Sequence, residues 1–90
     1  SVNLPDCSME IYDHVRICCI HKNIPKMITQ ISDALSTSNV NIENLMNKSK
    51  NELAYTMVDI AEVVNGYILN KIKQIPGMIR VSTYNFDKND

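Results

Sequence analysis

The residues best suited to binding chemistry lie in a short polar stretch between a strand-like and a helix-like segment. His21, Asn23 and Pro25 fall where the apolar run that starts at His14 ends and a helical pattern begins. Free backbone N–H groups in the first turn of a helix, together with the helix dipole, favour an anion at such a point. An asparagine amide both donates and accepts hydrogen bonds, and an imidazole can do either. These residue types predict a site for the carboxylate, ammonium and hydroxyl groups of a small amino acid.

Two further asparagines, Asn39 and Asn41, stand at the expected start of the next strand. We expect that start to lie at the same end of the sheet, so that Asn41 joins the site. Each residue also has a purely structural interpretation. Asn23 can cap the helix, Asn41 can shape the turn into the strand, and His21 can be an exposed residue at a strand end. The residue types alone leave ligand binding as one hypothesis beside these roles.

Catalysis is a second possibility, and the pattern argues against it. An enzyme of this size needs a nucleophile beside a base, or a cradle for an oxyanion. Small phosphatases with the same order of elements use an arginine and a glycine-rich loop after the first strand, whereas this chain has Lys22 to Pro25 there and no glycine before Gly66. His14 and His21 lie near opposite ends of one strand and cannot share a substrate. We therefore expect no catalytic residues in this chain.

Composition excludes other classes of function. Ninety residues, of which 44% are hydrophobic and 21% charged, are typical of one globular domain. Nine basic and ten acidic residues leave a net charge of −1, which gives no electrostatic footprint for nucleic acid or an anionic membrane. No expected strand carries the aromatic pair on which RNA-binding sheets stack bases. No apolar run approaches the ~20 residues of a transmembrane helix, and no signal-type leader opens the sequence. We expect neither nucleic acid nor membrane as a partner.

The cysteines indicate a reducing compartment. Cys7, Cys18 and Cys19 are an odd number without the spacing of metal ligands, so we expect neither a disulfide framework nor a metal site. Adjacent residues of a strand point to opposite faces, so one of Cys18 and Cys19 is expected in the core. Free thiols fit a cytoplasmic location.

The periodicity of apolar residues predicts four strands and two helices. The strands are expected at His14–His21, from Val40 to a hairpin turn at Asn47–Asn51, at Glu52–Ile60 and at Met78–Tyr84. One helix is expected to have Pro25 in its first turn and to end at Ser36–Asn39, and the other to carry Val64, Ile68, Ile72 and Ile75 on one face. The order βαββαβ with right-handed crossovers predicts a ferredoxin-like α+β sandwich, a four-stranded antiparallel sheet with both helices on one face.

Four segments in this order resemble a known family. They are Ile20–Pro25, Asn39–Glu43, Ala54–Ile60 and Ile75–Val81. Over about residues 14 to 84 the sequence is similar to the ACT regulatory domains of D-3-phosphoglycerate dehydrogenases. Its opening, Ser1 to Asp6, resembles the segment that joins the catalytic region to that domain. The resemblance implies a linker from a missing catalytic region at 1–13, an ACT domain at 14–86 and a polar tail at 87–90.

The resemblance implies a regulatory role in serine biosynthesis. In serine-sensitive members of the family, ACT domains pair edge to edge and bind L-serine at the seam, so that the end product inhibits the first committed enzyme. The histidine and asparagine of the family's loop fall on His21 and Asn23, and its second asparagine, which reaches across the seam, falls on Asn41. The family usually has glycine after the loop proline. Here Lys26 follows Pro25, so its side chain either crowds the pocket or reaches the ligand's carboxylate.

The exposed edge of the second expected strand supports a seam independently of the resemblance. Unpaired backbone groups at such an edge invite another strand, and two copies can satisfy one another in an isologous contact. We expect a homodimer through about Val40 to Met46. No cofactor is expected in this chain, since NAD belongs to the catalytic region that the family carries elsewhere. The alternative function is an ACT domain that assembles its enzyme without sensing serine.

Overall fold

The structure is a computed structural model that describes residues 14–87. Its elements are β1 (His14–Lys22), α1 (Met27–Ser36), β2 (Ile42–Lys50), β3 (Leu53–Ile60), α2 (Gly66–Lys73) and β4 (Met78–Phe86). The linker expected at 1–13 and residues 88–90 of the expected tail lie outside the described residues.

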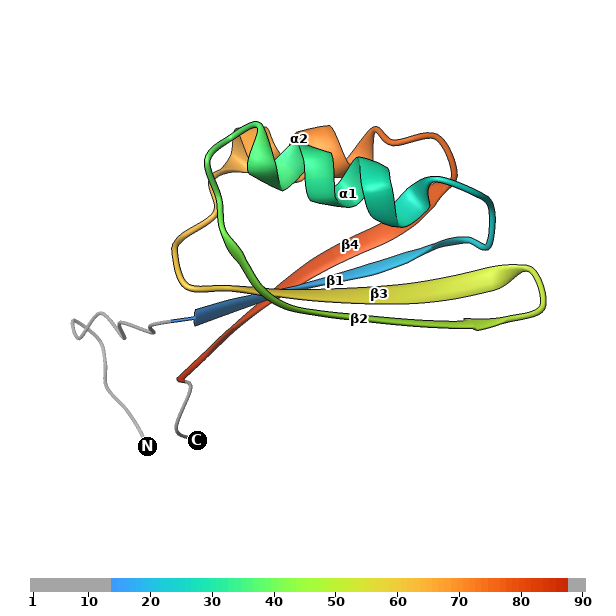
Figure 1. The fold of residues 1–90 in the computed structure, drawn as a ribbon, viewed down its shortest axis with the longest axis horizontal. Helices are drawn as coiled ribbons and strands as arrows, with labels where there is room; N and C mark the ends of the chain where they lie inside the picture. The colour runs from blue at the N-terminus through green and yellow to red at the C-terminus, as the bar shows by residue number, and fades with distance from the viewer. Residues whose placement is uncertain (1–13, 88–90) are drawn as a thin grey trace.

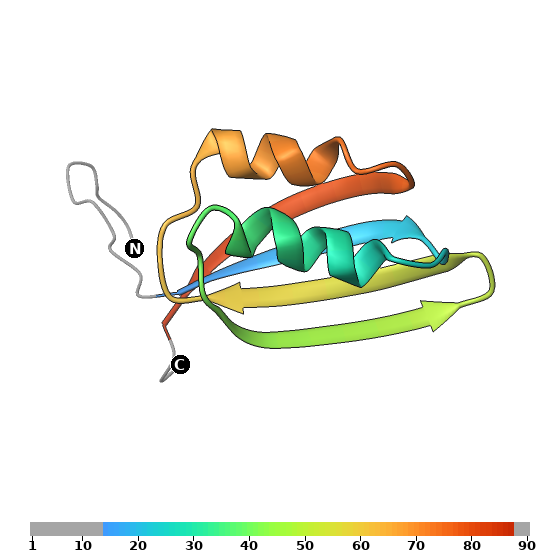
Figure 2. The same ribbon diagram turned by 45° about the horizontal axis from the view of Figure 1, so that its top comes forward.

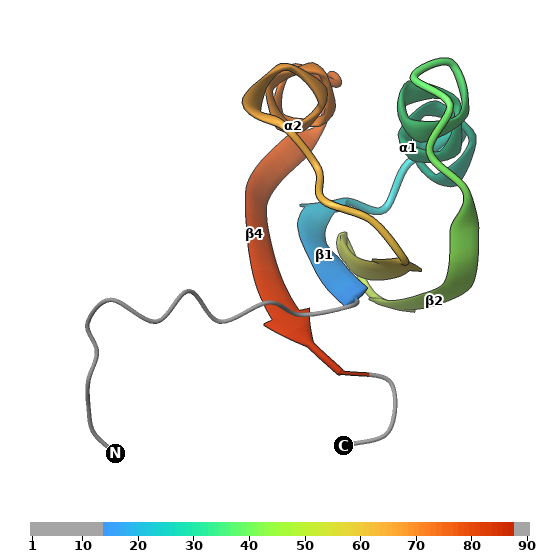
Figure 3. The same ribbon diagram turned by 90° about the vertical axis from the view of Figure 1, so that its left-hand side faces the viewer.

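The predicted ferredoxin-like fold is confirmed. The four strands form one sheet in the order β2-β3-β1-β4, and every neighbouring pair is antiparallel. Both helices lie on one face of this sheet, and Figure 3 shows the two layers end-on. Because β1 and β2 are each antiparallel to β3, they run in the same direction (Figures 1 and 2). The ends of β1 and β2 therefore lie at the same end of the sheet, as do their beginnings.

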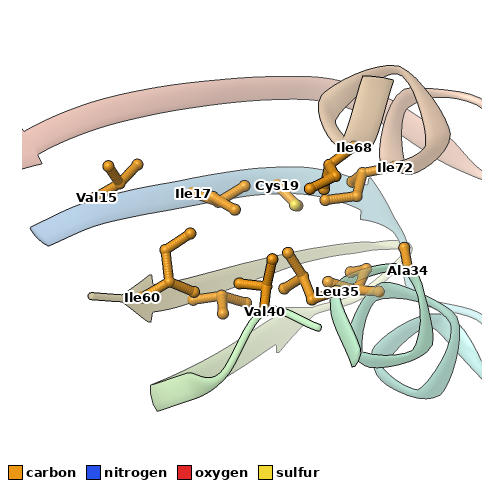
Figure 4. Packing of buried hydrophobic residues seen from close by; sticks show 11 residues of the cluster. Val15, Ile17, Cys19, Ala34, Leu35, Val40, Ile60, Ile68 and Ile72 are labelled. Atoms are coloured by element: carbon orange, nitrogen blue, oxygen red, sulfur yellow. The ribbon is translucent and has the colours of Figure 1, made fainter. Parts of the chain in front are cut away.

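The core fills the space between the helices and the sheet. It takes alternate residues of the strands and one stripe of each helix, as their periodicities require. Its buried members are Val15, Ile17, Cys19, Ile31, Ala34, Leu35, Val40, Val58, Ile60, Ile68 and Ile72 (Figure 4). Burial raises the pKa of the Cys19 thiol to about 12, so this thiol stays protonated. The neighbouring Cys18 is on the other face, against Tyr55, which confirms that the two cysteines point to opposite sides.

The open face of the sheet carries an ion pair across its two central strands. Arg16 on β1 is in register with Asp59 on β3, and its Nε and Nη2 lie 2.7 and 3.0 Å from the two carboxylate oxygens. The guanidinium also lies 5.0 Å from the centre of the Phe86 ring, which joins β4 to the pair. The hydrogen bond from Arg16 holds the pKa of Asp59 below its ordinary value.

The first helix begins later than its sequence pattern indicates. The prediction of Pro25 in the first turn is wrong, since the N-cap is Lys26 and the helix starts at Met27. Lys26 has a φ of 70°, in the left-handed region, so the chain turns sharply after the proline before it becomes helical. The other end is as predicted, because short hydroxyl side chains there donate to backbone carbonyls of the last turn.

Two strand ends were placed too early from the sequence. The hairpin turn predicted at Asn47–Asn51 is wrong: β2 continues to Lys50, and a turn of two residues, Asn51 and Glu52, follows it. The residues Asn47–Lys50 have the polar composition of a turn. They nevertheless form a strand, whose apolar alternation is weak because this edge strand is exposed. Asn51 adopts a φ of 58°, which asparagine tolerates well. The last strand likewise runs to Phe86 rather than to Tyr84.

A close backbone contact fixes the loop after β1. Gly77 has a φ of 97°, and a Cβ built on it would lie 2.9 Å from the Cδ1 of Ile24. The Gly77 carbonyl accepts a hydrogen bond of 2.9 Å from the backbone N–H of Lys22. A φ near 97° is strained for any residue with a Cβ, so glycine is favoured at this turn before β4.

We expect Leu35→Ala to destabilise the domain by about 2 to 5 kcal/mol, because Leu35 is fully buried between α1 and the sheet and its truncation leaves a cavity. The midpoint of thermal unfolding should fall by roughly 10 °C or more for a domain of this size. Val63→Ala is the matched control, since Val63 is 84% exposed and should change the unfolding free energy by no more than about 0.5 kcal/mol. Equal effects of the two changes would contradict the packing described here.

We expect the Arg16–Asp59 pair to stabilise the fold when the pH is above the pKa of Asp59, and not when the pH is below it. Its folded pKa is lowered, so the stabilisation is present above the ordinary carboxyl pKa near 3.9 and is lost as the pH falls through the lower folded pKa. Urea unfolding should show the stability difference between wild type and Asp59→Asn shrinking from about pH 6 to about pH 2. Asp33→Asn, on the exposed surface of α1, is the control. A difference that stays constant over this range would exclude the ion pair as its source.

Candidate functional site

The end of β1, the start of α1 and the β2–β3 hairpin lie at one end of the molecule (Figures 1 and 2). A cavity opens between them. Its volume is about 140 Å³, which suits a ligand of a few heavy atoms. It is lined by His21, Asn23, Ile24, Lys26, Met27, Ile28, Thr29, Asn47 and Ala54. Three of the residues proposed from the sequence, His21, Asn23 and Lys26, therefore converge on one cavity.

His21 forms the inner wall of the cavity. It is only 2% exposed, so its interpretation as an exposed residue at a strand end is wrong. Its Nε2 lies 2.8 Å from the hydroxyl oxygen of Thr56, and its Nδ1 lies 2.8 Å from the backbone carbonyl oxygen of Lys22. The Thr56 hydroxyl in turn donates to the Oδ1 of Asn47 at 2.7 Å. A chain of hydrogen bonds thus runs from the cavity wall to the edge strand β2.

Asn23 connects the loop after β1 to the β2–β3 turn. Its side-chain amide donates to the Asn51 carbonyl at 3.1 Å, and its backbone N–H donates to the Glu52 carbonyl at 2.9 Å. It does not cap α1, whose N-cap residue is Lys26. Among the described residues its side-chain oxygen makes no hydrogen bond and is available to a donor on a ligand.

The start of α1 supplies the cavity with positive charge. The backbone N–H groups of Met27, Ile28 and Thr29 belong to the first turn and have no acceptor within the helix. The ammonium of Lys26 forms no ion pair within residues 14–87, and no aspartate or glutamate lines the cavity. Pro25 precedes this turn and is not part of the lining. The site is therefore suited to an anionic group such as a carboxylate.

Asn41 lies at the opposite end of the sheet, and the expectation that it shares an end with His21 is wrong. Ile42 pairs with Ile60, which pairs with Val15 near the beginning of β1. The reason is the direction of β2, which runs parallel to β1, so its beginning is far from the end of β1. The Asn41 backbone N–H donates to the Glu62 carboxylate at 3.3 Å, and its side chain is exposed.

Sequence inspection missed two polar residues of the site, Thr56 and Asn47. Thr56 is fully buried, on the helix-facing side of β3, and Asn47 is its partner in register on β2. The available signal was a threonine in an otherwise apolar alternating set, Ala54, Val58 and Ile60. A hydroxyl on a buried face needs a hydrogen-bond partner, and that need points to His21.

The described residues show neither a metal centre nor a membrane span. No group of three or more histidine, cysteine or acidic side chains within 14–87 is placed to hold a metal ion. Neither α1 nor α2 has the length and apolar character required to cross a bilayer.

Related sequences come from one kind of enzyme. D-3-phosphoglycerate dehydrogenase 2 of Saccharomyces cerevisiae is 38% identical over 68 residues, which cover 70% of this chain and 14% of that protein. D-3-phosphoglycerate dehydrogenase of Escherichia coli K12 is 30% identical over 82 residues, which cover 89% of this chain and 20% of that protein. The chain thus spans only a small part of the length of these relatives. No protein-family model matches it.

Solved structures identify the fold. The crystal structure of the ACT domain from the GTP pyrophosphokinase of Chlorobium tepidum superimposes with a TM-score of 0.65, over 82% of this chain and all of that domain, at 19% identity. The order of elements, the antiparallel sheet and the two helices on one face agree with that likeness. The chain has the fold of an ACT domain and is related in sequence to a segment of the D-3-phosphoglycerate dehydrogenases.

Proposed function

We propose that this ACT domain is a regulatory module that binds a small amino acid, with L-serine as the first candidate. The observation that carries the proposal is the convergence of His21, Asn23, Lys26 and the first turn of α1 on one cavity without an acidic residue. In this proposal the domain belongs to a longer NAD-dependent phosphoglycerate dehydrogenase and has no catalytic residues of its own. Serine then acts as a feedback inhibitor of that enzyme.

The cavity offers a partner for each group of the ligand. The carboxylate is bound by the free N–H groups of α1 and by the Lys26 ammonium, which favour an anion. The Asn23 side-chain oxygen accepts from the ligand's ammonium. His21 hydrogen-bonds to the hydroxyl or the carboxylate. The small volume of the cavity, about 140 Å³, favours a short side chain.

A second copy of the chain completes the site in this proposal. β2 is an edge strand, with Glu43 near its beginning and Lys48 and Lys50 near its end. An antiparallel pairing of two β2 strands about a two-fold axis sets the acidic end of one against the basic end of the other. The same pairing carries the partner's Asn41 toward the end of this β2, which borders the cavity.

The other edge of the sheet is less suited to such a pairing. β4 carries one basic residue, Arg80, and no acidic residue. Two antiparallel copies of β4 would therefore have no opposite charges to match. The cavity is also lined by Asn47 of β2 and by no residue of β4.

Regulation then follows from linkage. Serine at the seam favours the arrangement of paired domains in which both copies complete the site. It can shift the enzyme toward that arrangement by no more than its difference in affinity for the two arrangements.

Assembly without serine sensing is the second candidate, and one observation favours it. Both ring nitrogens of His21 and the side-chain N–H of Asn23 already have partners within the domain. In addition, Lys26 stands in a left-handed conformation where the resemblance has glycine. In this alternative the cavity stays empty and the β2 edge serves only to pair subunits.

We expect L-serine to raise the thermal unfolding midpoint of the 90-residue chain. A ligand at about 100 times its dissociation constant adds about 2.7 kcal/mol, which corresponds to roughly 10 to 20 °C for a domain of this size. D-serine and glycine should give smaller shifts, and Asn23→Ala should abolish the shift given by L-serine. Asn70→Ala, on the exposed surface of α2, is the control that should leave it unchanged.

No shift with any of these ligands would favour assembly without sensing. Where L-serine does shift the wild-type chain, the variant Lys26→Gly separates the two expected roles of Lys26. A larger serine shift in this variant would show that the lysine crowds the cavity, whereas a smaller one would show that its ammonium binds the carboxylate.

We expect the double change Lys48→Glu and Lys50→Glu to weaken dimerisation at least about tenfold, because all the charged side chains of each β2 edge are then acidic and repel those of the other. Sedimentation equilibrium measures the effect. Lys73→Glu with Arg80→Glu, at exposed positions on α2 and β4, is the matched control for net charge and should leave association unchanged. A wild-type chain that stays monomeric at tens of micromolar would contradict the proposed seam.

A further inference from the structure

We propose that Thr56 and Asn47 are positioning residues of the site. They hold the His21 ring through a hydrogen bond to its Nε2, so that Nδ1 is the nitrogen that hydrogen-bonds to a bound amino acid. This inference rests on the proposed function, because it assigns the ligand's contact to one nitrogen of His21. It also assigns roles to two residues that are absent from the set proposed from the sequence.

The hydrogen-bond partners place a hydrogen on both ring nitrogens. The single hydrogen of the Thr56 hydroxyl goes to Asn47 Oδ1, so the Thr56 oxygen accepts from Nε2. The Lys22 carbonyl oxygen, 2.8 Å from Nδ1, can only accept, so Nδ1 must carry a hydrogen as well. A ligand that replaces this carbonyl must therefore also present an acceptor. The carboxylate and the hydroxyl oxygen of an amino acid both qualify, whereas its ammonium does not.

The two hydrogen bonds of His21 differ in what is lost when they break. The Lys22 carbonyl also accepts from the Ile24 backbone N–H at 3.0 Å, so it stays hydrogen-bonded when Nδ1 turns to a ligand. Thr56 is fully buried, and a broken bond to Nε2 would leave that nitrogen without a partner in a place that water does not reach. An unsatisfied buried polar group is costly, so Nδ1 exchanges its partner and Nε2 keeps its own.

Asn47 extends the support to the edge of the sheet. It accepts the Thr56 hydroxyl hydrogen at 2.7 Å and lies opposite Thr56 in the β2–β3 register. The orientation of the buried hydroxyl, and hence of the His21 ring, depends on where β2 sits against β3. Since Asn47 also lines the cavity, a displacement of β2 on pairing would reach the ligand's contact through two hydrogen bonds.

The experiment is a titration of L-serine into variants of the 90-residue chain, followed by calorimetry. We expect Thr56→Val, which keeps the side-chain shape and removes the hydroxyl, to weaken serine binding about 5- to 30-fold, and Thr56→Ser to restore it. Asn47→Ala, on the exposed strand β2, should weaken binding in the same direction with less risk to folding. Thr83→Val on β4 is the matched control and should bind serine as wild type does, because Thr83 is exposed and remote from the cavity.

The ring nitrogens of His21 give a second readout that a purely structural role would not produce. In ¹⁵N NMR of labelled histidine, L-serine should move the Nδ1 resonance more than the Nε2 resonance. Thr56→Val should move Nε2 in the absence of ligand. Wild-type affinity in both Thr56→Val and Asn47→Ala, or a larger response at Nε2, would overturn the inference while leaving serine binding intact. Failure of the wild-type chain to bind serine would instead overturn the proposed function, and the inference with it.

Discussion

The direction of β2 is the constraint on which the site depends. A right-handed connection through α1 returns the chain to the same sheet, and with β3 inserted between them β1 and β2 run in parallel. The end of β1, the start of α1 and the β2–β3 turn are thereby collected at one end of the molecule. His21, Asn23 and Asn47 meet there, and Asn41 is left at the other end. A site that includes Asn41 therefore requires a second chain, which makes ligand binding and pairing two parts of one proposal.

Backbone geometry then gives this end of the domain its shape. Lys26, Asn51 and Gly77 all have positive φ, and each stands in a turn that borders or supports the cavity. Asn23 joins the first of these turns to the second by two hydrogen bonds, and Lys22 joins the loop to the third. The loop is thus held on both sides before any ligand arrives. A preorganised loop loses little conformational entropy on binding, which favours a small ligand with few contacts.

The sequence was sufficient to predict the fold because β1, α1, β3 and α2 each bury one face, and the period of their apolar residues shows it. It failed at β2, whose exposed polar residues carry no such period, and at Pro25, where a left-handed Lys26 delays the helix. Of the site, His21 and Asn23 were found from their residue types, and Lys26 from the resemblance. Asn41 was misplaced because strand direction is a property of the whole topology. Thr56 was missed because its importance lies in a partner 35 residues away.

The most direct test of the account is a ¹H–¹⁵N NMR titration of the 90-residue chain with L-serine, which reports on every backbone amide. We expect the amides of Asn23, Ile24, Lys26 to Thr29 and Asn47 to move together with that of Asn41, although Asn41 lies at the far end of the same sheet. Such a joint response is possible in a paired molecule, in which the partner's Asn41 borders the site. Shifts confined to other parts of the sheet, or movement of the loop without Asn41 in a dimeric sample, would contradict it.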